Sequence, residues 1–432
     1  MRKMNKATLN KIFNSALNGA NPKKCILESI ILKKNSLKIQ NKSYDLNKIN
    51  KIFVISFGKS SIPMAEGIKI ILKNKITEGL IISNEKPKSK IKNFNYIKSS
   101  HPIPNKYSLI AAKEIIKLLS TTQPKDLIIF LISGGGSSLV AAPEEGISLK
   151  EKQIIFDRLL RSGLDIKMIN FIRKKISSVK GGKLLMHSNS TNICNILISD
   201  VIEGKPSDIA SGPSVKELKT NLKLKNKVLK SKFVKSELPN INKIVNKKLP
   251  TKTNQTVRNF IIADNKKALD FAQTKAKELG YKTILHSFKV QGEASNIGLK
   301  FAKKVIDLAK KEKKSKKPIC FLFGGESTVN VKGSGIGGRN MELALSFAIG
   351  VSGNKKISAL FAGTDGIDGN TNSAGAFCDS KTALKASKIG ISPRSYLINN
   401  DSYSFFKKLK DLKITGSTGC NVNDIGIILI DF

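Results

Sequence analysis

The fold class follows from Leu127-Ile-Ile-Phe-Leu-Ile-Ser-Gly-Gly-Gly136, an apolar run that ends at a serine and three glycines. A short apolar run bounded by a glycine turn is typical of a buried strand. The same order of strand, turn and helix-like residues occurs in Lys51-Ile-Phe-Val-Ile-Ser-Phe-Gly-Lys59 and in Ile193-Cys-Asn-Ile-Leu-Ile-Ser-Asp200. Its repetition predicts an α/β sheet whose loops gather at the carboxyl ends of the strands.

A second block of the same kind begins at Arg258-Asn-Phe-Ile-Ile-Ala-Asp264 and ends with Ile425-Gly-Ile-Ile-Leu-Ile-Asp431. A Lys-dense stretch without motifs, from about residue 216 to 252, separates the two blocks. The length of 432 residues allows two domains, each with its own core. We therefore expect two α/β domains, with a Rossmann-like sheet covered by helices on both faces in residues 1–240 and a second α/β domain in 255–432.

The chain is strongly basic, with 76 Lys+Arg against 32 Asp+Glu and a formal net charge of +44. The excess is almost all Lys and is spread along the chain, and aromatic residues make up only 6%, without Trp. Proteins that read bases or bind single strands favour Arg and stacking aromatics. We expect no specific nucleic-acid binding, and a positive field that draws small anionic metabolites to the protein.

Targeting and redox signals favour the cytoplasm. No run approaches the roughly eighteen apolar residues that a membrane helix needs, and no secretory signal follows the basic N-terminus. The five Cys are far apart and form no CxxC pair, as expected for reduced thiols in the cytosol. The composition leaves a homo-oligomer open.

Arg339 is one of only seven Arg and lies directly after the glycine-rich loop Gly333-Ser-Gly335-Ile-Gly-Gly338. A guanidinium is a planar fork that binds carboxylates and phosphates through two parallel hydrogen bonds. The glycines let a ligand approach the backbone. The segment is therefore interpreted as an anion clamp.

The loops after the first strands offer further candidates. Lys59 follows an apolar strand, but a P-loop would need a glycine where Phe53 stands, so only a lysine at a strand end remains. Ser133-Gly-Gly-Gly-Ser137-Ser138 can expose backbone N–H groups to a phosphate or carboxylate, although a plain flexible turn is the alternative.

Carboxylates at strand ends could hold Mg²⁺ or accept a hydroxyl proton. Asp200 follows one strand, and Asp365 and Asp368 lie in the glycine-rich loop after another. Local capping of the backbone is the competing interpretation for aspartates in glycine turns.

Other catalytic classes lack their motifs. The three His stand alone without zinc spacing, and no GxSxG elbow is present. The loop from Gly333 to Gly338 formally fits GxGxxG, but no acidic residue follows at the distance that a ribose partner requires. A dinucleotide site is therefore disfavoured.

Taken in order, the motifs resemble those of the type II glycerate kinases, the MOFRL-containing glycerate 2-kinases. The resemblance covers nearly the whole chain. Its motifs are Phe57-Gly-Lys59-Ser, Ser100-His-Pro-Ile-Pro104, Leu131-Ile-Ser-Gly-Gly-Gly-Ser-Ser-Leu139, Arg173-Lys-Lys-Ile-Ser-Ser-Val-Lys-Gly-Gly-Lys183, Ser199-Asp-Val201, Ala210-Ser-Gly-Pro213, Gly324-Gly-Glu-Ser-Thr328, Gly337-Gly-Arg-Asn340, Ala362-Gly-Thr-Asp-Gly-Ile-Asp-Gly369 and Thr418-Gly-Cys-Asn-Val-Asn-Asp424.

The resemblance implies ATP- and Mg²⁺-dependent phosphorylation of D-glycerate to 2-phosphoglycerate, in a cleft between the two domains, with the MOFRL region at about residues 315–425. Lys59, Asp200 and Arg339 match positions that the family uses at its active site. We assign Arg339 to a carboxylate or phosphate, Lys59 to the transferring phosphoryl group, and Asp200 to the attacking hydroxyl or the metal. The expected substrate- and phosphate-binding residues are Gly134, Gly135, Gly136, Ser137, Ser138, Gly325, Glu326, Gly335, Gly338, Asn340, Asp365, Asp368, Asn421 and Asn423.

The chain departs from the family pattern at several places. Ile202-Glu-Gly-Lys205 replaces an acidic stretch, Lys175 a histidine and Cys420 a small hydroxyl residue. The alternative within enzymes is a hydroxypyruvate reductase. The alternative from another class is a Lys-rich nucleic-acid-binding protein.

Overall fold

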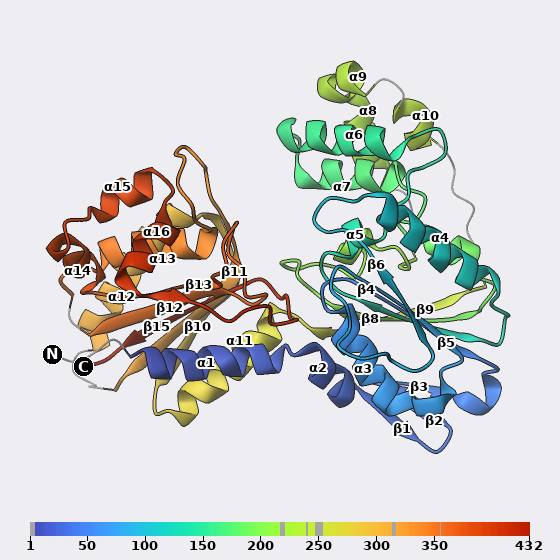
Figure 1. The fold of residues 1–432 in the computed structure, drawn as a ribbon, viewed down its shortest axis with the longest axis horizontal. Helices are drawn as coiled ribbons and strands as arrows, with labels where there is room; N and C mark the ends of the chain where they lie inside the picture. Colours follow the sequence, from blue (N-terminus) through green and yellow to red (C-terminus); the bar gives the residue numbers. More distant parts are fainter. Residues whose placement is uncertain (1–4, 217–220, 239–240, 247–253, 313–316, 355) are drawn as a thin grey trace. The chain divides into compact units, whose positions relative to one another are not determined.

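The computed structural model describes residues 5–216, 221–238, 241–246, 254–312, 317–354 and 356–432. The strands of this part form two six-stranded sheets and one three-stranded sheet (Figure 1). The chain folds into two compact units. Unit 1 comprises Met1–Cys25, Ser199–Glu203 and Ala263–Phe432, and unit 2 comprises Ile26–Ile198 and Gly204–Ile262. Each unit contains one of the large sheets.

The large sheet of unit 2 has the strand order β6-β5-β4-β7-β8-β9, and its pairs from β6 to β8 are all parallel. With β4 counted as the first strand, the order is the 3-2-1-4-5-6 of the Rossmann fold. The predicted Rossmann-like sheet is confirmed. Its strands are β4 (Ile52–Phe57), β5 (Glu78–Ser83), β6 (Phe94–Lys98), β7 (Leu127–Ile132), β8 (Asn192–Ile198) and β9 (Thr256–Ala263).

Helices on both faces explain why these strands are continuous apolar runs, since every residue of β4 and β7 is buried. On one face Phe53, Ile55 and Phe57 share a core cluster with the apolar side of α4 (Lys106–Ser120). On the other face Ser56 Oγ donates to the Ser61 carbonyl at 2.7 Å, at the start of α3 (Ser61–Leu72).

The rest of unit 2 is mainly helical. Part of the Lys-dense stretch forms short helices that share a core cluster with two longer ones, so this stretch does not separate the two units. The remaining elements are α2 (Pro22–Ser29), β1 (Ile30–Lys33), β2 (Ser36–Ile39), β3 (Lys42–Asp45), η1 (Leu46–Lys48), η2 (Lys73–Lys75), α5 (Gly136–Leu139), α6 (Leu149–Arg161), α7 (Ile166–Lys175), η3 (Lys183–His187), η4 (Ile209–Ser211), α8 (Leu222–Lys230), α9 (Lys232–Glu237) and α10 (Ile241–Asn246).

The sheet of unit 1 has the order β10-β11-β15-β12-β13-β14, with β10 and β11 parallel and the other neighbours antiparallel. This mixed sheet gives the expected second α/β domain. Its strands are β10 (Lys282–Glu293), β11 (Ile319–Thr328), β12 (Ile357–Gly363), β13 (Gly375–Asp379), β14 (Leu412–Lys413) and β15 (Asp424–Ile430).

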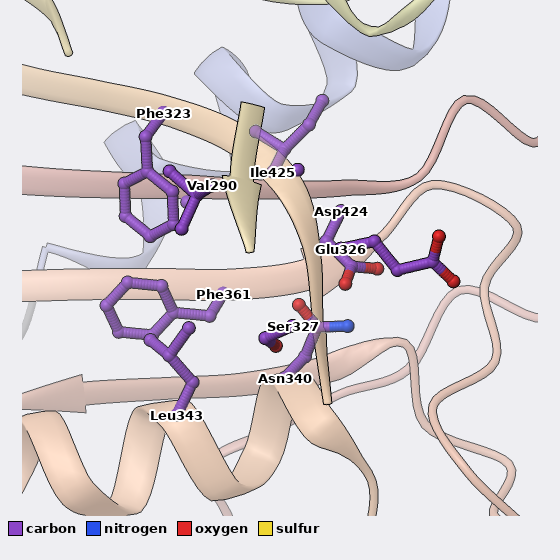
Figure 2. A pocket seen from close by; sticks show the side chains of 11 residues that line it. Val290, Phe323, Glu326, Ser327, Asn340, Leu343, Phe361, Asp424 and Ile425 are labelled. Atoms are coloured by element: carbon purple, nitrogen blue, oxygen red, sulfur yellow. The ribbon is translucent and has the colours of Figure 1, made fainter. Parts of the chain in front are cut away.

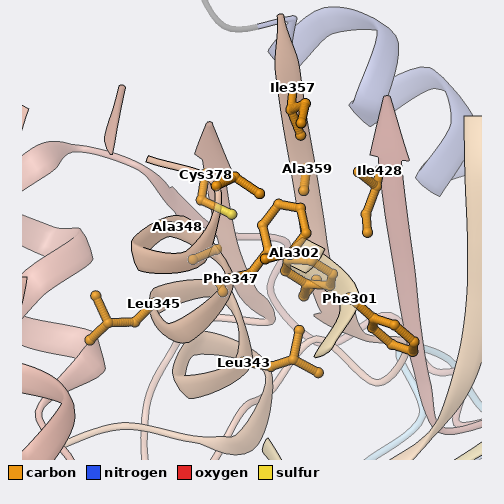
Figure 3. Close-up of a cluster of buried hydrophobic side chains, with 14 of the residues drawn as sticks. Phe301, Ala302, Leu343, Leu345, Phe347, Ala348, Ile357, Ala359, Cys378 and Ile428 are labelled. Atoms are coloured by element: carbon orange, nitrogen blue, oxygen red, sulfur yellow. The ribbon is translucent and has the colours of Figure 1, made fainter. Parts of the chain in front are cut away.

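Alternate strand residues of unit 1 pack against helices to form an aromatic-rich core (Figure 3). Phe347 of α13 and Phe361 of β12 meet with ring centroids 5.2 Å apart. The strand residues that point the opposite way, such as Leu322 and Leu360, are also fully buried. Helices of this unit are α1 (Lys6–Gly19), α11 (Asn265–Glu278), α12 (Ala294–Lys311), α13 (Arg339–Gly350), α14 (Thr382–Lys388), α15 (Pro393–Ile398) and α16 (Ser402–Leu409).

The units differ from the predicted domain limits at the N-terminus. The predicted first domain, residues 1–240, includes helix α1, whereas α1 packs on α11 and β15 of unit 1. Leu9, Ile12, Phe13 and Ala16 form its buried face, at the spacing of successive helical turns. A division by position along the chain misses this contact, because α1 and its partners lie at opposite ends of the sequence.

Candidate active site

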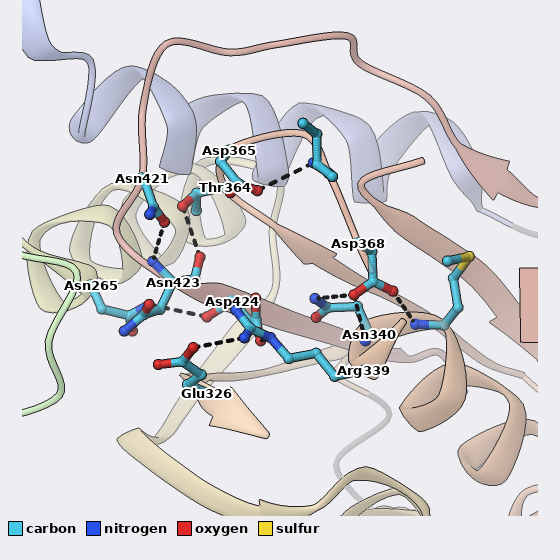
Figure 4. A network of polar contacts seen from close by, with 12 residues as sticks. Asn265, Glu326, Arg339, Asn340, Thr364, Asp365, Asp368, Asn421, Asn423 and Asp424 are labelled. Carbon is cyan, nitrogen blue, oxygen red and sulfur yellow. Dashed lines mark hydrogen bonds and ion pairs between the residues drawn. The ribbon is translucent and has the colours of Figure 1, made fainter. Parts of the chain in front are cut away.

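Arg339, the first residue of α13, is bound by two carboxylates of its own unit (Figure 4). Its Nε and Nη2 donate to the two oxygens of Asp424 at 2.6 and 3.1 Å, and its Nη1 donates to Glu326 Oε1 at 2.7 Å. The predicted fork is therefore present, and it holds protein carboxylates. Asp424 was not among the predicted site residues.

Burial and the neighbouring charges shift the pKa values of Arg339 and Asp424 in opposite directions. Burial lowers the pKa of Arg339, but Asp424 and Glu326 outweigh it, so the net pKa is raised and the guanidinium stays charged. Burial raises the pKa of Asp424, and Arg339 opposes that rise. The charge of Arg339 thus favours the ionised form of a carboxylate whose burial favours the protonated form.

Asp368 caps the N-terminus of α13. Its Oδ1 accepts from the Asn340 N–H at 3.1 Å and its Oδ2 from the Met341 N–H at 2.8 Å, and Asn340 Nδ2 adds a third bond at 3.3 Å. Burial raises the pKa of Asp368 to about 7, nearby Asp424 adds to the rise, and the N–H donors oppose it. These bonds are those of the local cap, and a role of Asp368 in substrate binding stays a prediction.

The glycine-rich loop before Arg339 is held by the segment 399–401 rather than open to a ligand. The Gly335 N–H donates to the Asn399 carbonyl at 3.0 Å, and the Ile336 N–H donates to Asp401 Oδ1 at 3.1 Å. A Cβ on Gly335 would lie 2.4 Å from Asp401 Cβ, and one on Gly338 would lie 2.3 Å from Asp368 Cγ. Close packing therefore accounts for Gly335 and Gly338, and phosphate binding by this loop stays a prediction.

The other predicted loop residues of unit 1 include Asn421 and Asn423, which precede Asp424, and Asp365. Thr364 Oγ1 donates to the Asn423 carbonyl at 2.8 Å, and the Asn423 N–H donates to Asn421 Oδ1 at 3.4 Å. Asp365 Oδ1 accepts from the Ile367 N–H at 3.2 Å within its own turn. Asn265, which sequence reasoning did not single out, donates to the Asp424 carbonyl at 3.0 Å.

A cavity of about 10 Å³ adjoins this network, lined on one side by Gly325, Glu326 and Asp424 (Figure 2). This volume suits about one water molecule. Val290, Phe323 and Phe361 form its apolar wall. This cavity itself is thus too small for a substrate molecule.

In unit 2 the loops after β4 and β7 meet, as expected at the switch point of a Rossmann sheet. The Lys59 N–H donates to the Gly134 carbonyl at 2.8 Å, and the Ser60 N–H donates to Ser133 Oγ at 2.9 Å. Gly58 has a φ of 123°, and a Cβ on it would lie 2.3 Å from Ser133 Oγ. Lys59 and the triple-glycine turn are thereby brought together.

The turn after β7 leads into the single helical turn α5, which begins at Gly136. Gly135 is left-handed, with a φ of 80°, and a Cβ there would lie 2.9 Å from the His101 ring and 3.1 Å from Lys59 Cγ. Ser138 Oγ donates to the Gly135 carbonyl at 3.2 Å. A side chain at position 135 would therefore crowd the His101 ring and lie in tight contact with Lys59.

Ser137 contacts a group of cations that sequence reasoning placed in a motif but not in the site. Its Oγ accepts from Arg173 Nη2 at 3.1 Å and also from Lys180 Nζ. Lys152 and Lys183 are buried nearby. Arg173 could have been noticed as one of the few Arg, whereas Lys152, Lys180 and Lys183 differ from the many other Lys by their burial.

Asp200 follows β8 and is half-buried. The departure from the family pattern beside it places Glu203 in an exposed ion pair with Lys289, which contributes little to stability. Among the described residues no group of three His, Cys, Asp or Glu side chains could hold a metal. Because Mg²⁺ in kinases is bound by one or two carboxylates together with substrate phosphates, Asp200 fits as a single ligand.

Family models match most of the chain. The model described as "Domain of unknown function (DUF4147)" matches residues 8–246, and the MOFRL family model matches residues 319–424. The region between these ranges includes α11, β10 and α12 of unit 1. Together the two models cover the Lys59, Asp200 and Arg339 motifs.

Curated relatives match over nearly their full length. The chain is 33% identical to a glycerate 2-kinase of Pyrococcus horikoshii, over 97% of this chain and 96% of that protein. It is 35% identical to a D-glycerate 2-kinase of Thermotoga maritima, over 92% and 98%. A protein of Agrobacterium vitis that is 36% identical over 88% of this chain is named a putative hydroxypyruvate reductase.

A solved structure shares the fold. The crystal structure of a glycerate kinase from Thermotoga maritima superimposes with a TM-score of 0.84 at 33% identity, covering 98% of this chain and 99% of the other. Sequence, motifs and fold agree over the same residues. The chain therefore belongs to the glycerate 2-kinase family, which confirms the family predicted from its motifs.

Proposed function

We propose that this enzyme transfers the γ-phosphoryl group of ATP to the 2-hydroxyl of D-glycerate, giving 2-phosphoglycerate and ADP. The observation that carries the proposal is the match to glycerate 2-kinases over nearly the full chain. Lys59, Asp200 and Arg339 all lie within the ranges that the family models match. The glycine turn beside Lys59 supports it, because phosphoryl transfer depends on positioning and on cationic groups.

The proposed reaction is an in-line displacement at the γ-phosphorus. The glycerate oxygen bonds to phosphorus while the bond to the bridging β,γ-oxygen breaks, and ADP leaves. Asp200 accepts the hydroxyl proton or orients the hydroxyl, and Lys59 balances charge on the transferring group. Bound Mg²⁺ would neutralise phosphate charge, and Asp200 would be the carboxylate that reaches it.

Arg339 is proposed to orient glycerate. A guanidinium has five N–H donors, and three are used by Asp424 and Glu326. Two N–H groups remain for the glycerate carboxylate. Asp424 then acts on the substrate only through Arg339, as a positioning residue.

A hydroxypyruvate reductase is disfavoured by the position of the glycines. Dinucleotide-binding Rossmann folds place the glycine-rich turn after the first strand, whereas here β4 is followed by Gly58-Lys59-Ser60 and the triple glycine follows β7. The formal GxGxxG of unit 1 precedes a helix whose N-terminus is occupied by Asp368.

We place the reaction in the cytoplasm, with small molecules as the partners of the enzyme. The five Cys are buried free thiols, which suits the cytoplasm as the place of catalysis. Within the described residues no helix has the length and apolar character needed to cross a bilayer. The partners proposed are the two small-molecule substrates, without a specific nucleic acid.

The test is an assay of the purified protein with D-glycerate, ATP and Mg²⁺, following ADP release and assigning the product by phosphorus NMR. We expect 2-phosphoglycerate, no turnover of L-glycerate and a strongly reduced kcat for Asp200→Asn. Absence of ADP together with NAD(P)H oxidation on hydroxypyruvate would overturn the proposal.

A further inference from the structure

The cations around Ser137 form a cluster whose positive charge is only partly balanced by carboxylates of the described chain. Arg173 and Lys180 come from different segments and both donate to the same neutral hydroxyl, Ser137 Oγ. Ser211 Oγ lies 3.3 Å from that oxygen. A serine hydroxyl can accept these bonds, but it balances neither charge.

The two remaining buried cations have structural partners. Lys152 Nζ donates to the Ala142 carbonyl at 3.0 Å, and Lys183 Nζ binds Glu144 Oε2 at 2.8 Å. Among the described residues Glu144 is the carboxylate of this cluster, against four cations. Lys152 and Lys183 therefore fix the loop, while Arg173 and Lys180 lack a carboxylate partner within the described chain.

Burial makes this excess of positive charge costly. Lys180 is 4% exposed and Lys152 is 8% exposed. Burial and the neighbouring cations lower the pKa of Lys180, and they lower the pKa of Lys152 to about 7 despite the opposing effect of Glu144. An anion bound at Ser137 would relieve this repulsion.

Backbone strain coincides with the same place. Ala210 and Ser211 both have positive φ, 50° and 65°, which is uncommon for residues other than glycine. Ser211 contacts Ser137, and a Cβ on Gly136 would lie 3.0 Å from Ala210 Cβ. Strained backbone of this kind concentrates at ligand-binding sites.

We propose that Arg173 and Lys180, with Ser137 of the glycine turn, bind the phosphate groups of the nucleotide. The identity of the ligand rests on the proposed kinase function. A multiply charged phosphate matches the charge excess better than a single carboxylate, and the guanidinium fork fits two phosphate oxygens. The site lies at the carboxyl end of β7, where Rossmann sheets bind ligands.

Direct binding tests the site without catalysis. Titration calorimetry would measure ATP and sodium pyrophosphate binding to the full-length protein in the absence of glycerate. Arg173→Gln and Lys180→Met should each weaken both by roughly 10- to 100-fold, as expected for hydrogen bonds to charged groups. The matched control is Lys167→Gln, which removes an exposed charge from the same helix as Arg173.

Thermal unfolding separates binding from a structural role. Lys180→Met removes a buried, unbalanced charge, so its Tm should equal or exceed that of the wild type while ATP binding weakens. A purely structural lysine would instead lower the Tm and leave affinity unchanged. Arg173→Lys, which keeps the charge and loses the fork, should bind pyrophosphate with intermediate affinity.

The outcomes distinguish this inference from the proposed function. Unchanged ATP and pyrophosphate affinity in both variants would refute the inference, whatever the glycerate assay shows. A loss of D-glycerate binding alone would also refute it, since the cluster would then be a carboxylate site. If pyrophosphate binding depends on Arg173 and Lys180 but glycerate is not phosphorylated, the inference stands and the proposed function fails.

Discussion

Arg339 binds two carboxylates of the protein itself, so its replacement should affect the stability of the fold. Asp424 receives two of its hydrogen bonds and is 8% exposed. A lysine at position 339 keeps the charge but cannot bind both Asp424 oxygens and Glu326 in the same plane. If Arg339 binds glycerate as proposed, its replacement should therefore change both the free energy of unfolding and substrate binding.

For Arg339→Lys we expect a loss of about 2 kcal/mol in the free energy of unfolding, since charged hydrogen bonds are lost at a buried carboxylate. Glycerate KM should also rise. Urea unfolding and steady-state kinetics measure the two effects. Arg394→Lys, at an exposed position, is the control and should change neither. If the variant has the unfolding free energy of the wild type, the two hydrogen bonds from Arg339 to Asp424 do not stabilise the fold.

Asp368 should give the protein a pH-dependent stability. Its pKa is raised from an ordinary value of 3.8 to about 7, first by burial. Between these values the folded protein keeps a proton that the unfolded chain releases, so stability falls as the pH rises from about 4 to 7.

Asp368→Asn should remove this slope, because asparagine does not titrate. Unfolding free energies of both proteins at several pH values across this range give the comparison. Parallel pH profiles would show that the pKa of Asp368 in the folded protein is close to its ordinary value.

At the scale of elements, α1 covers one face of the unit 1 sheet although it begins the chain. Phe13 is fully buried and lies in the contact with α11 and β15. Phe13→Ala should cost about 3–5 kcal/mol, as for other large side chains removed from cores. Amide hydrogen exchange should show reduced protection of the β15 backbone in this variant. Lys11→Ala, exposed on the same helix, should leave exchange unchanged.

Elements could be predicted where the signal is local. The apolar runs of β4, β7 and β8 report burial on both faces directly, so the Rossmann-like sheet followed from them. The pairing of Arg339 with Asp424 joins residues 85 positions apart, and no local pattern encodes it. Lys180 differs from the many other lysines by its burial, which depends on the fold. The hydrogen bonds of the Gly335 and Ile336 N–H groups to Asn399 and Asp401 are also long-range, so no local pattern in the loop encodes them.

For the whole molecule, the net charge of +44 predicts an unusual response to salt. Raising NaCl from about 0.01 to about 0.15 M shortens the Debye length from about 30 to about 8 Å and screens self-repulsion, so the Tm should rise. Sodium pyrophosphate at equal ionic strength should raise it further through site binding. A Tm that is insensitive to NaCl would show that the positive charges are already compensated in the folded protein.

The order in which the chain is made sets a further condition on folding. Helix α1 ends at Gly19, whereas its partners α11 and β15 begin at Asn265 and Asp424. At translation rates of about 5–20 residues per second, the apolar side of α1 waits roughly 10–50 seconds for α11 and longer for β15. Unit 2 can be completed during this interval, but unit 1 cannot. Helix α1 leaves the ribosome long before its partners and is thus among the last helices to be buried. During this interval the nascent chain carries an exposed amphipathic segment to which a chaperone can bind.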